Sequence, residues 1–252
     1  MEQYFVNNII NSNRYTVDDK DLFKHIAVVL RHQTGDELFL VDQSKALFKA
    51  IIDQIDVDGK QIIFNVEKDN RPSTEMPVDV LVACSLSKKD KVEWIAQKST
   101  ELGAKKIILF SSKYSIMNWK SNIVEKKISR INEIVKNAAQ QSKRRIIPEV
   151  IYYSSMKDLL KESAESKIVA YEESAKDGEQ SLMAKELAKK PSSIIGVFGP
   201  EGGFAPEEID LLKESGYMAA GLGPRIMRAE TAPMYFLSAI SFNYELQQLG
   251  DN

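Results

Sequence analysis

Short apolar runs alternate with helical patterns through the second part of the chain, and this alternation limits the possible folds more than any other feature. Residues 78–84 form a nearly continuous apolar run, which is typical of a parallel strand buried on both faces. A helical pattern follows, which we expect Asp90 to cap and Gly103 to end. This order predicts an α/β domain with a mostly parallel sheet. Further strands are expected at 106–111, 149–153, 167–171, 193–198 and 217–221, and further helices at 121–141 and 206–215.

The first seventy or so residues have a different pattern, with short β-rich runs separated by turns. Strands are expected at 37–42, 47–52 and 61–66, and a short helix near 20–30. This pattern fits a small barrel or sandwich. The polar segment 69–77, which contains Pro72 and Pro77, indicates a linker. We therefore expect two domains, at residues 1–72 and 73–252.

Composition excludes several classes of protein. The formal net charge of −2 gives no global signal for nucleic acid, so any such contact must come from local basic patches. The single cysteine, Cys84, excludes an intramolecular disulfide, and with only two histidines we expect no metal site. No apolar run approaches the roughly 20 residues of a membrane span, and the N-terminus does not resemble a signal peptide. We expect a cytoplasmic protein without membrane contact.

Two unusual loops follow expected strands. Residues 198–204 read Phe-Gly-Pro-Glu-Gly-Gly-Phe, and residues 222–232 place Arg225, Arg228 and Glu230 on a glycine-proline loop. Because ligands of parallel sheets bind beyond the carboxyl ends of the strands, the two loops predict one composite small-molecule site. Neither loop matches a Walker or dinucleotide-binding motif.

Each loop also has a purely structural interpretation. The glycines of the first loop, Gly199, Gly202 and Gly203, allow positive φ and close approach to a ligand, but they would equally suit a tight strand-to-helix turn. In the second loop, an arginine–glutamate pair could stabilise a helix start. The other interpretation is that main-chain atoms of this loop bind a ligand while an arginine meets the substrate.

Local basic clusters lie beside expected helix ends. One contains Lys88, Lys89 and Lys91, and the other contains Lys143, Arg144 and Arg145. Charge runs of this kind are usually solvated surface, but both lie at strand–helix junctions that a substrate could reach. His25, Arg31 and His32 lie in or next to the N-terminal helix and could contact phosphate, although a structural role is the more common one for histidine.

Together the motifs resemble the RsmE family, the 16S ribosomal RNA (uracil-N3)-methyltransferases. The resemblance spans nearly the whole chain, with the motifs in the family's order. They are His25 with Val29-Leu30-Arg31 and Gly35-Asp36; Ser87-Lys88-Lys89-Asp90-Lys91 with Glu93, Gln97-Lys98 and Glu101-Leu102-Gly103-Ala104; Gln140-Gln141-Ser142-Lys143-Arg144 leading to Ile147-Pro148; Gly199 to Phe204; and Leu222-Gly223 with Arg228-Ala229-Glu230-Thr231-Ala232.

The resemblance implies a fold, a cofactor and partners. It implies a PUA-like N-terminal β-barrel that helps to bind RNA, and a C-terminal SPOUT-class domain with a trefoil knot. It also implies S-adenosylmethionine as cofactor, a homodimer, and 16S rRNA of the small ribosomal subunit as substrate. Met227 stands where the family usually has leucine, and Pro233 lies early in the last helix. By motif match, the residues lining the cofactor site would be Gly199, Glu201, Gly202, Leu222, Gly223, Ile226, Met227 and Arg228.

The chemistry of methylation at uracil N3 suggests roles for the charged residues. N3 must lose a proton, and the resulting negative charge spreads onto O2 and O4 of the base. We hypothesise that Arg228 stabilises this charge. Glu230 or Glu201 either accepts the proton or orients the arginine, and the sequence leaves both roles open. The RNA-contact candidates are His25, Arg31, Lys88, Lys89, Lys91, Lys143, Arg144 and Arg145.

Two other functions remain open at this point. One is a SPOUT-like methyltransferase acting on another RNA position, such as a ribose 2′-hydroxyl. The other is a non-catalytic RNA-binding protein of ribosome assembly. The mild net acidity fits a pure RNA binder poorly, and such a protein would have no use for the two glycine loops.

Overall fold

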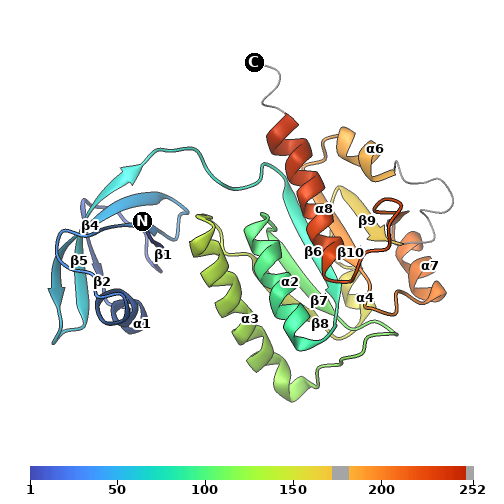
Figure 1. Ribbon diagram of the computed structural model, residues 1–252, viewed down its shortest axis with the longest axis horizontal. Helices are drawn as coiled ribbons and strands as arrows, with labels where there is room; N and C mark the ends of the chain where they lie inside the picture. Colours follow the sequence, from blue (N-terminus) through green and yellow to red (C-terminus); the bar gives the residue numbers. More distant parts are fainter. Residues whose placement is uncertain (172–181, 248–252) are drawn as a thin grey trace. The chain divides into compact units, whose positions relative to one another are not determined.

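The structure is a computed structural model that describes residues 1–171 and 182–247 (Figure 1). The chain divides into two compact units. The N-terminal unit comprises Met1–Thr74 together with Gln140–Ile146, and the C-terminal unit comprises Glu75–Ala139 and Ile147–Asn252. The segment Gln140–Ile146 thus belongs with the N-terminal unit, although it follows a helix of the C-terminal unit along the chain.

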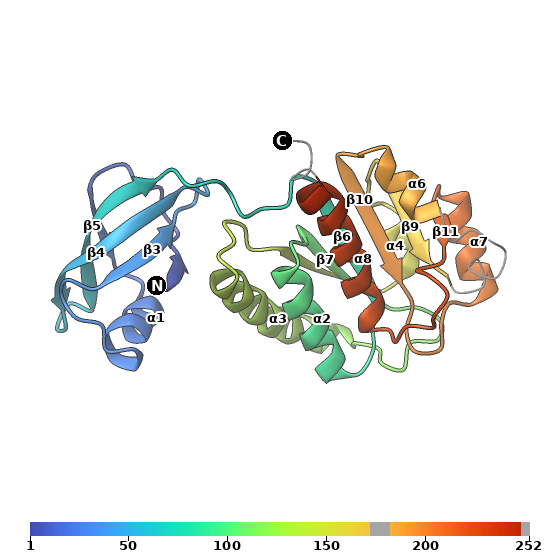
Figure 2. The same ribbon diagram turned by 45° about the horizontal axis from the view of Figure 1, so that its top comes forward.

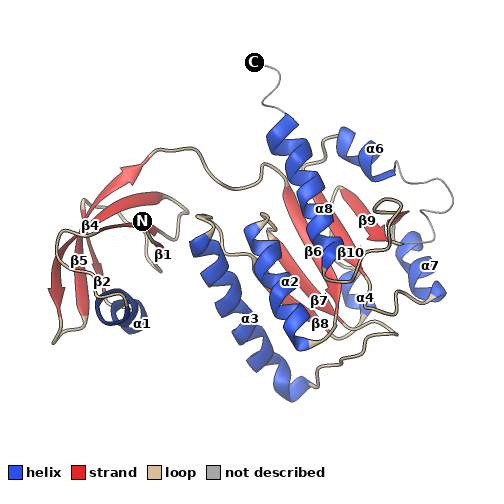
Figure 3. Ribbon diagram, in the orientation of Figure 1, coloured by secondary structure: helices blue, strands red, loops and turns tan. Residues whose placement is uncertain are grey.

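A five-stranded sheet forms the N-terminal unit, with strand order β1-β3-β4-β5-β2 (Figure 3). β1 pairs with β3 in parallel, and the other pairs are antiparallel. The alternate residues of the long strands that point inward form its core, which includes the fully buried Leu38, Ile62 and Phe64. The elements are β1 Gln3–Phe5, β2 Arg14–Val17, α1 Lys20–Phe23, the π-helical turn η1 Lys24–Val29, β3 Glu37–Val41, β4 Leu47–Asp56 and β5 Gln61–Asp69.

The predicted strands of this unit are present, and two more join them. β4 and β5 extend beyond the predicted runs, because their outer ends are polar and carry little hydrophobic signal. β1 and β2 have only 3 and 4 residues, too few for an alternating pattern to register. The predicted helix is α1 continued by η1, and the Asp19 carboxylate caps it by accepting hydrogen bonds from two main-chain N–H groups.

The C-terminal unit contains a six-stranded sheet in which every pair of neighbouring strands is parallel, with order β11-β9-β10-β6-β7-β8 (Figure 2). The predicted α/β fold with a parallel sheet is therefore confirmed. Its strands are β6 Asp79–Ser85, β7 Lys106–Phe110, β8 Glu149–Tyr153, β9 Ser166–Ala170, β10 Ser193–Phe198 and β11 Met218–Ala220. Its helices are α2 Lys89–Glu101, α3 Ser121–Gln141, α4 Met156–Leu159, α6 Leu182–Ala188, α7 Pro206–Glu214 and α8 Thr231–Ser241, which the π-helical turn η3 Phe242–Leu246 continues.

Helices cover both faces of this sheet, which explains why its strands are apolar on both sides. In β6, Val80 and Val82 belong to the core beneath α2, α3 and α8, whereas Leu81 and Ala83 belong to the core beneath α4 and α7. Figures 1 and 2 both show α2, α3 and α8 side by side on one face. None of the helices in the described ranges is long and apolar enough to cross a membrane.

The helix ends follow the sequence signals with one exception. Gly103 has φ +92° and follows the last residues of α2, and Pro206 is the first residue of α7, as predicted. The prediction that Asp90 caps α2 is wrong, because the N-cap is Lys88 and no side chain caps this end. Asp90 lies in the first turn, where its charge still favours the positive end of the helix dipole.

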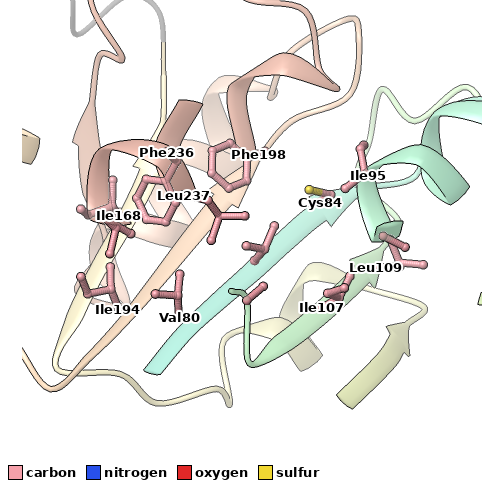
Figure 4. Close-up of a cluster of buried hydrophobic side chains, with 14 of the residues drawn as sticks. Val80, Cys84, Ile95, Ile107, Leu109, Ile168, Ile194, Phe198, Phe236 and Leu237 are labelled. Atoms are coloured by element: carbon pink, nitrogen blue, oxygen red, sulfur yellow. The ribbon is translucent and has the colours of Figure 1, made fainter. Parts of the chain in front are cut away.

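A single glycine allows α8 to pack directly on β10. A Cβ atom at Gly196 would lie 2.6 Å from Cε1 of Phe236 and 2.9 Å from Cζ of Phe198. Both rings are buried and pack edge to face, with their centroids 5.4 Å apart (Figure 4). Contacts this short cannot persist in a packed core, so a side chain at this position must shift one or both rings, and Phe236 carries such a shift to α8.

We therefore expect Gly196→Ala to destabilise the C-terminal unit by roughly 1–3 kcal/mol, the usual cost of overpacking a core. Thermal unfolding followed by circular dichroism would measure the loss. In a Gly196→Ala/Phe236→Leu variant the shorter side chain relieves the overlap, so the double variant should lose less stability than the sum of its single variants. Strict additivity would contradict this account.

Candidate active site

A cavity of about 770 Å³ opens at the carboxyl edge of the parallel sheet in the C-terminal unit. It lies where β9, β10 and β11 end, at the edge where parallel sheets usually bind ligands. Its volume falls within the range of small-molecule and cofactor sites. The lining residues are Lys91, Ala170, Tyr171, Phe198, Gly199, Pro200, Glu201, Gly202, Gly203, Phe204, Leu222, Gly223, Pro224, Arg225, Ile226, Met227, Arg228, Ala229 and Ala232.

The loop after β10, which we call the glycine loop (residues 199–204), exposes its main chain to the cavity because it has few side chains. A Cβ atom at Gly199 would come within 3.3 Å of the Gly203 main chain, and one at Gly202 within 3.3 Å of Tyr114. Of the three glycines that would allow positive φ, only Gly203 adopts it, at +71°. Gly199 and Gly202 serve close packing instead.

The loop after β11, residues 222–227, is held by few interactions of its own. Within the described part of the chain, its main-chain N–H and C=O groups form no hydrogen bond. Gly223 has φ +103°, a conformation that other residues rarely adopt. The chain is anchored again at Arg228, whose main-chain oxygen accepts hydrogen bonds from the N–H groups of Thr231 and Ala232. The loop thus lines the cavity while its main-chain groups have no partner within the described part of the chain.

An ion-pair network brings together α2, the glycine loop and the start of α8. Nζ of Lys91 lies 2.9 Å from Oε1 of Glu201 and 3.1 Å from Oε2 of Glu230, and Glu230 is the N-cap of α8. The carboxylates of Glu201 and then Glu230, both in ion-pair contact, raise the pKa of Lys91. Burial alone would raise the pKa of Glu230. Three other influences lower this pKa, and they outweigh burial: a hydrogen bond to its own main chain, the neighbouring Lys91, and the charge of Arg228. Lys91 and Glu230 are thus charged at neutral pH.

All eight residues predicted to bind cofactor line this single cavity, including Arg228. Glu230, the second candidate for catalysis, contacts the site through Lys91. Ala170 and Tyr171 also line the cavity but were not predicted, although their place at the end of a parallel strand was a signal that could have identified them. No group of three or more potential metal-ligating side chains occurs among the described residues.

The candidate RNA-contact residues have differing surroundings. Lys88 is exposed and Lys89 begins α2. In the N-terminal unit, His25 and Arg31 are exposed, and the His25 ring packs edge-on against Tyr4. The other candidates of this unit are Lys143, whose Nζ donates to the Met1 carbonyl, and Arg145, which donates to the Arg71 carbonyl.

One of these expectations needs correction. Arg144 is only 3% exposed, and its main-chain oxygen accepts a hydrogen bond from the Gln3 side chain, so its guanidinium presents no open face to a phosphate. The ammonium group of Lys91, the remaining candidate, lies 2.9 Å from a carboxylate oxygen of Glu201 and 3.1 Å from one of Glu230. A lysine in a charge run looks the same in sequence whether it faces solvent or a neighbouring loop.

Comparisons with known proteins agree with this site. A family model described as an RNA methyltransferase domain matches residues 74–241. The chain is 36% identical to ribosomal RNA small subunit methyltransferase E of Bacillus subtilis, and the match covers 98% of each chain. The chain belongs to the RsmE family. Another RsmE relative, from Mycobacterium bovis, is 28% identical over 94% of this chain and 90% of its own.

A solved RsmE structure shows the same fold with a ligand present. The RsmE of Neisseria gonorrhoeae, bound to S-adenosyl methionine, is 25% identical and matches with a TM-score of 0.82, covering 97% of this chain and 98% of its own. A methyltransferase from Legionella pneumophila, at 24% identity, matches in fold with a TM-score of 0.78 over 96% of this chain and 98% of its own.

Proposed function

We propose that this chain transfers a methyl group from S-adenosylmethionine to N3 of a specific uridine in 16S rRNA of the small ribosomal subunit. The observation that carries this proposal is the single cavity formed by the glycine loop and residues 222–227, in a chain of the RsmE family. Membership of the family gives the reaction class and the cofactor. The choice of N3 as the target atom is the more specific part of the proposal.

The residues of the cavity fit S-adenosylmethionine. The unpaired main-chain groups of residues 222–227 suit the hydrogen-bonding edge of an adenine and the hydroxyls of a ribose. Gly203, with φ +71° and no atom within 4 Å of the position of a Cβ, lines the cavity and leaves its main chain open to a ligand. Phe198, Leu222 and Met227 supply apolar contact. When bound, the cofactor supplies a methyl group on a positively charged sulfur.

We assign to Arg228 the stabilisation of the negative charge that develops on the substrate. Arg228 is exposed at the cavity, and its main chain is fixed at the start of α8. A guanidinium at this position would stabilise the negative charge on uracil O2 or O4 when N3 loses its proton.

The structure favours an orienting role for Glu230 over that of a general base. A general base works best when its pKa lies near the working pH, whereas the pKa of Glu230 is lowered. The positive charge of Arg228 contributes to this lowering. We therefore propose that Glu230 positions Arg228 and Lys91, and that the Glu201 carboxylate, which lines the cavity, accepts the proton of N3.

Recognition of the target requires an accessible base. N3 lies on the Watson–Crick edge, so the uridine must be unpaired or flipped out. We propose that the N-terminal unit is a PUA-like RNA-binding domain and that phosphate contacts come from His25, Arg31, Lys88, Lys89, Lys143 and Arg145. We also propose a SPOUT-type trefoil knot in the domain of residues 73–252, a homodimer, and a cytoplasmic location where ribosomes assemble.

The test is mass mapping of modified uridines. Purified protein is incubated with S-adenosylmethionine and either unmodified small-subunit RNA or assembled small subunits, and the digested RNA is analysed. We expect one new N3-methyluridine. A 2′-O-methyl nucleoside would favour the other SPOUT activity. No methylation, together with no calorimetric binding of S-adenosylmethionine, would favour a non-catalytic assembly protein.

A further inference from the structure

Within the described residues, Lys91 alone connects the glycine loop by charge to the start of α8, three residues after the loop of residues 222–227. Its ammonium group contacts Glu201 of the glycine loop at 2.9 Å and Glu230 at the start of α8 at 3.1 Å. Within the described residues, no other ion pair involves residues 199–204 or 222–230. Three elements far apart in the sequence therefore meet at one nitrogen atom.

We propose that Lys91 is a positioning residue that sets the spacing of the two cofactor loops through Glu201 and Glu230, rather than a contact for RNA phosphate. The inference rests on the proposed function, because it assigns Lys91 to the cofactor side of that same site. The residue lies on the rigid helix α2 and also lines the cavity, so it holds the loops from a fixed position.

The loops need such a connection because little else holds them. Residues 222–227 form no main-chain hydrogen bond within the part of the chain described. The glycine loop has one internal main-chain bond, from the Gly203 N–H to the Pro200 oxygen. With so few main-chain bonds, the position of residues 222–227 depends on contacts at their ends, such as the ion pair at Glu230.

The effect should appear in cofactor binding more than in stability. The three side chains are 18–27% exposed, and partly exposed ion pairs contribute little to folding. The network carries two carboxylates against one ammonium group. Removing the ammonium leaves two like charges beside each other, which would push the glycine loop away from the start of α8.

The experiment compares Lys91→Met with Lys98→Met. Lys98 lies on the same helix and pairs with Glu101 at 2.8 Å, but it is not among the residues lining the cavity. S-adenosylmethionine binding is measured by calorimetry without RNA, and RNA binding by fluorescence anisotropy. We expect Lys91→Met to weaken cofactor binding about tenfold, with KM for cofactor changing more than kcat, and Lys98→Met to change neither.

Two further variants separate positioning from a general loss of structure. Lys91→Arg keeps the charge and should restore most of the affinity. Combining Lys91→Met with Glu201→Gln should cost less than the sum of the single losses, because both variants break the same contact.

Equal cofactor affinity of Lys91→Met and Lys98→Met would overturn the proposal. So would a Lys91→Met protein with weakened RNA binding and normal cofactor binding, since that is the behaviour of a phosphate contact. If the unchanged protein does not bind S-adenosylmethionine, the proposed function fails, and the role of Lys91 fails with it. If the unchanged protein binds the cofactor but methylates another atom, only the proposed target is wrong.

Discussion

Replacing Arg228 by alanine is expected to lower kcat by about 10²–10³-fold, the usual effect of removing one group that stabilises a developing anion. Cofactor affinity should change little, because the cofactor contacts proposed here come mainly from the main chain of residues 222–227 and from the glycine loop. Single-turnover methylation with saturating RNA and cofactor would measure the chemical step directly.

Arg225→Ala provides the matched control. Arg225 is exposed and lines the same cavity three residues earlier, but it precedes the point at which the main chain of Arg228 anchors the loop. We expect its removal to affect kcat far less. Arg228→Lys should recover only part of the rate, because an ammonium group cannot replace the planar guanidinium at two oxygens. A normal rate for Arg228→Ala with normal cofactor binding would show that the assigned role is wrong.

The sequence was sufficient for the α/β unit because the strands buried on both faces have a strong apolar signal. The run at 78–84 became β6, and the residues of that strand pack alternately against two groups of helices. The strands β1 and β2 were not predicted, and β11 was predicted with the wrong ends. Strands of 3 or 4 residues are too short to show a clear alternation of apolar and polar residues. The packing role of Gly196 could not be predicted from the sequence, because it depends on contact with Phe236 of another element.

The sequence predicted which loops line the cavity, but it did not predict which charged side chains pair with one another. Glycine loops after parallel strands meet at one sheet edge by topology, so the cavity lining followed from the motifs. The partners of Lys91 and the burial of Arg144 depend on side-chain directions across elements, which a charge run does not encode. Only the folded structure shows which basic side chains are solvated and which are buried.

Gly223→Ala tests whether the shape of the loop after β11, rather than any side chain, creates the cofactor site. Gly223 has φ +103°, and a Cβ atom there would meet only the Tyr235 hydroxyl at 3.9 Å, so the cost of alanine is backbone strain and not a clash. Strain of this kind costs roughly 1–3 kcal/mol. A loop that relieves it by moving would lose its fit to the ligand, so we expect S-adenosylmethionine to bind about 10–100-fold more weakly.

Gly216→Ala separates this effect from a loss of stability. Gly216 has φ +85° in the turn between α7 and β11, has open space around its α-carbon, and is not among the residues lining the cavity. Both variants should lower the thermal midpoint by similar amounts, because both impose alanine on a left-handed backbone. Only Gly223→Ala should weaken cofactor binding in calorimetry. If the two variants bind cofactor equally well, the conformation at Gly223 does not shape the site, and the side chains around the cavity must hold the ligand instead.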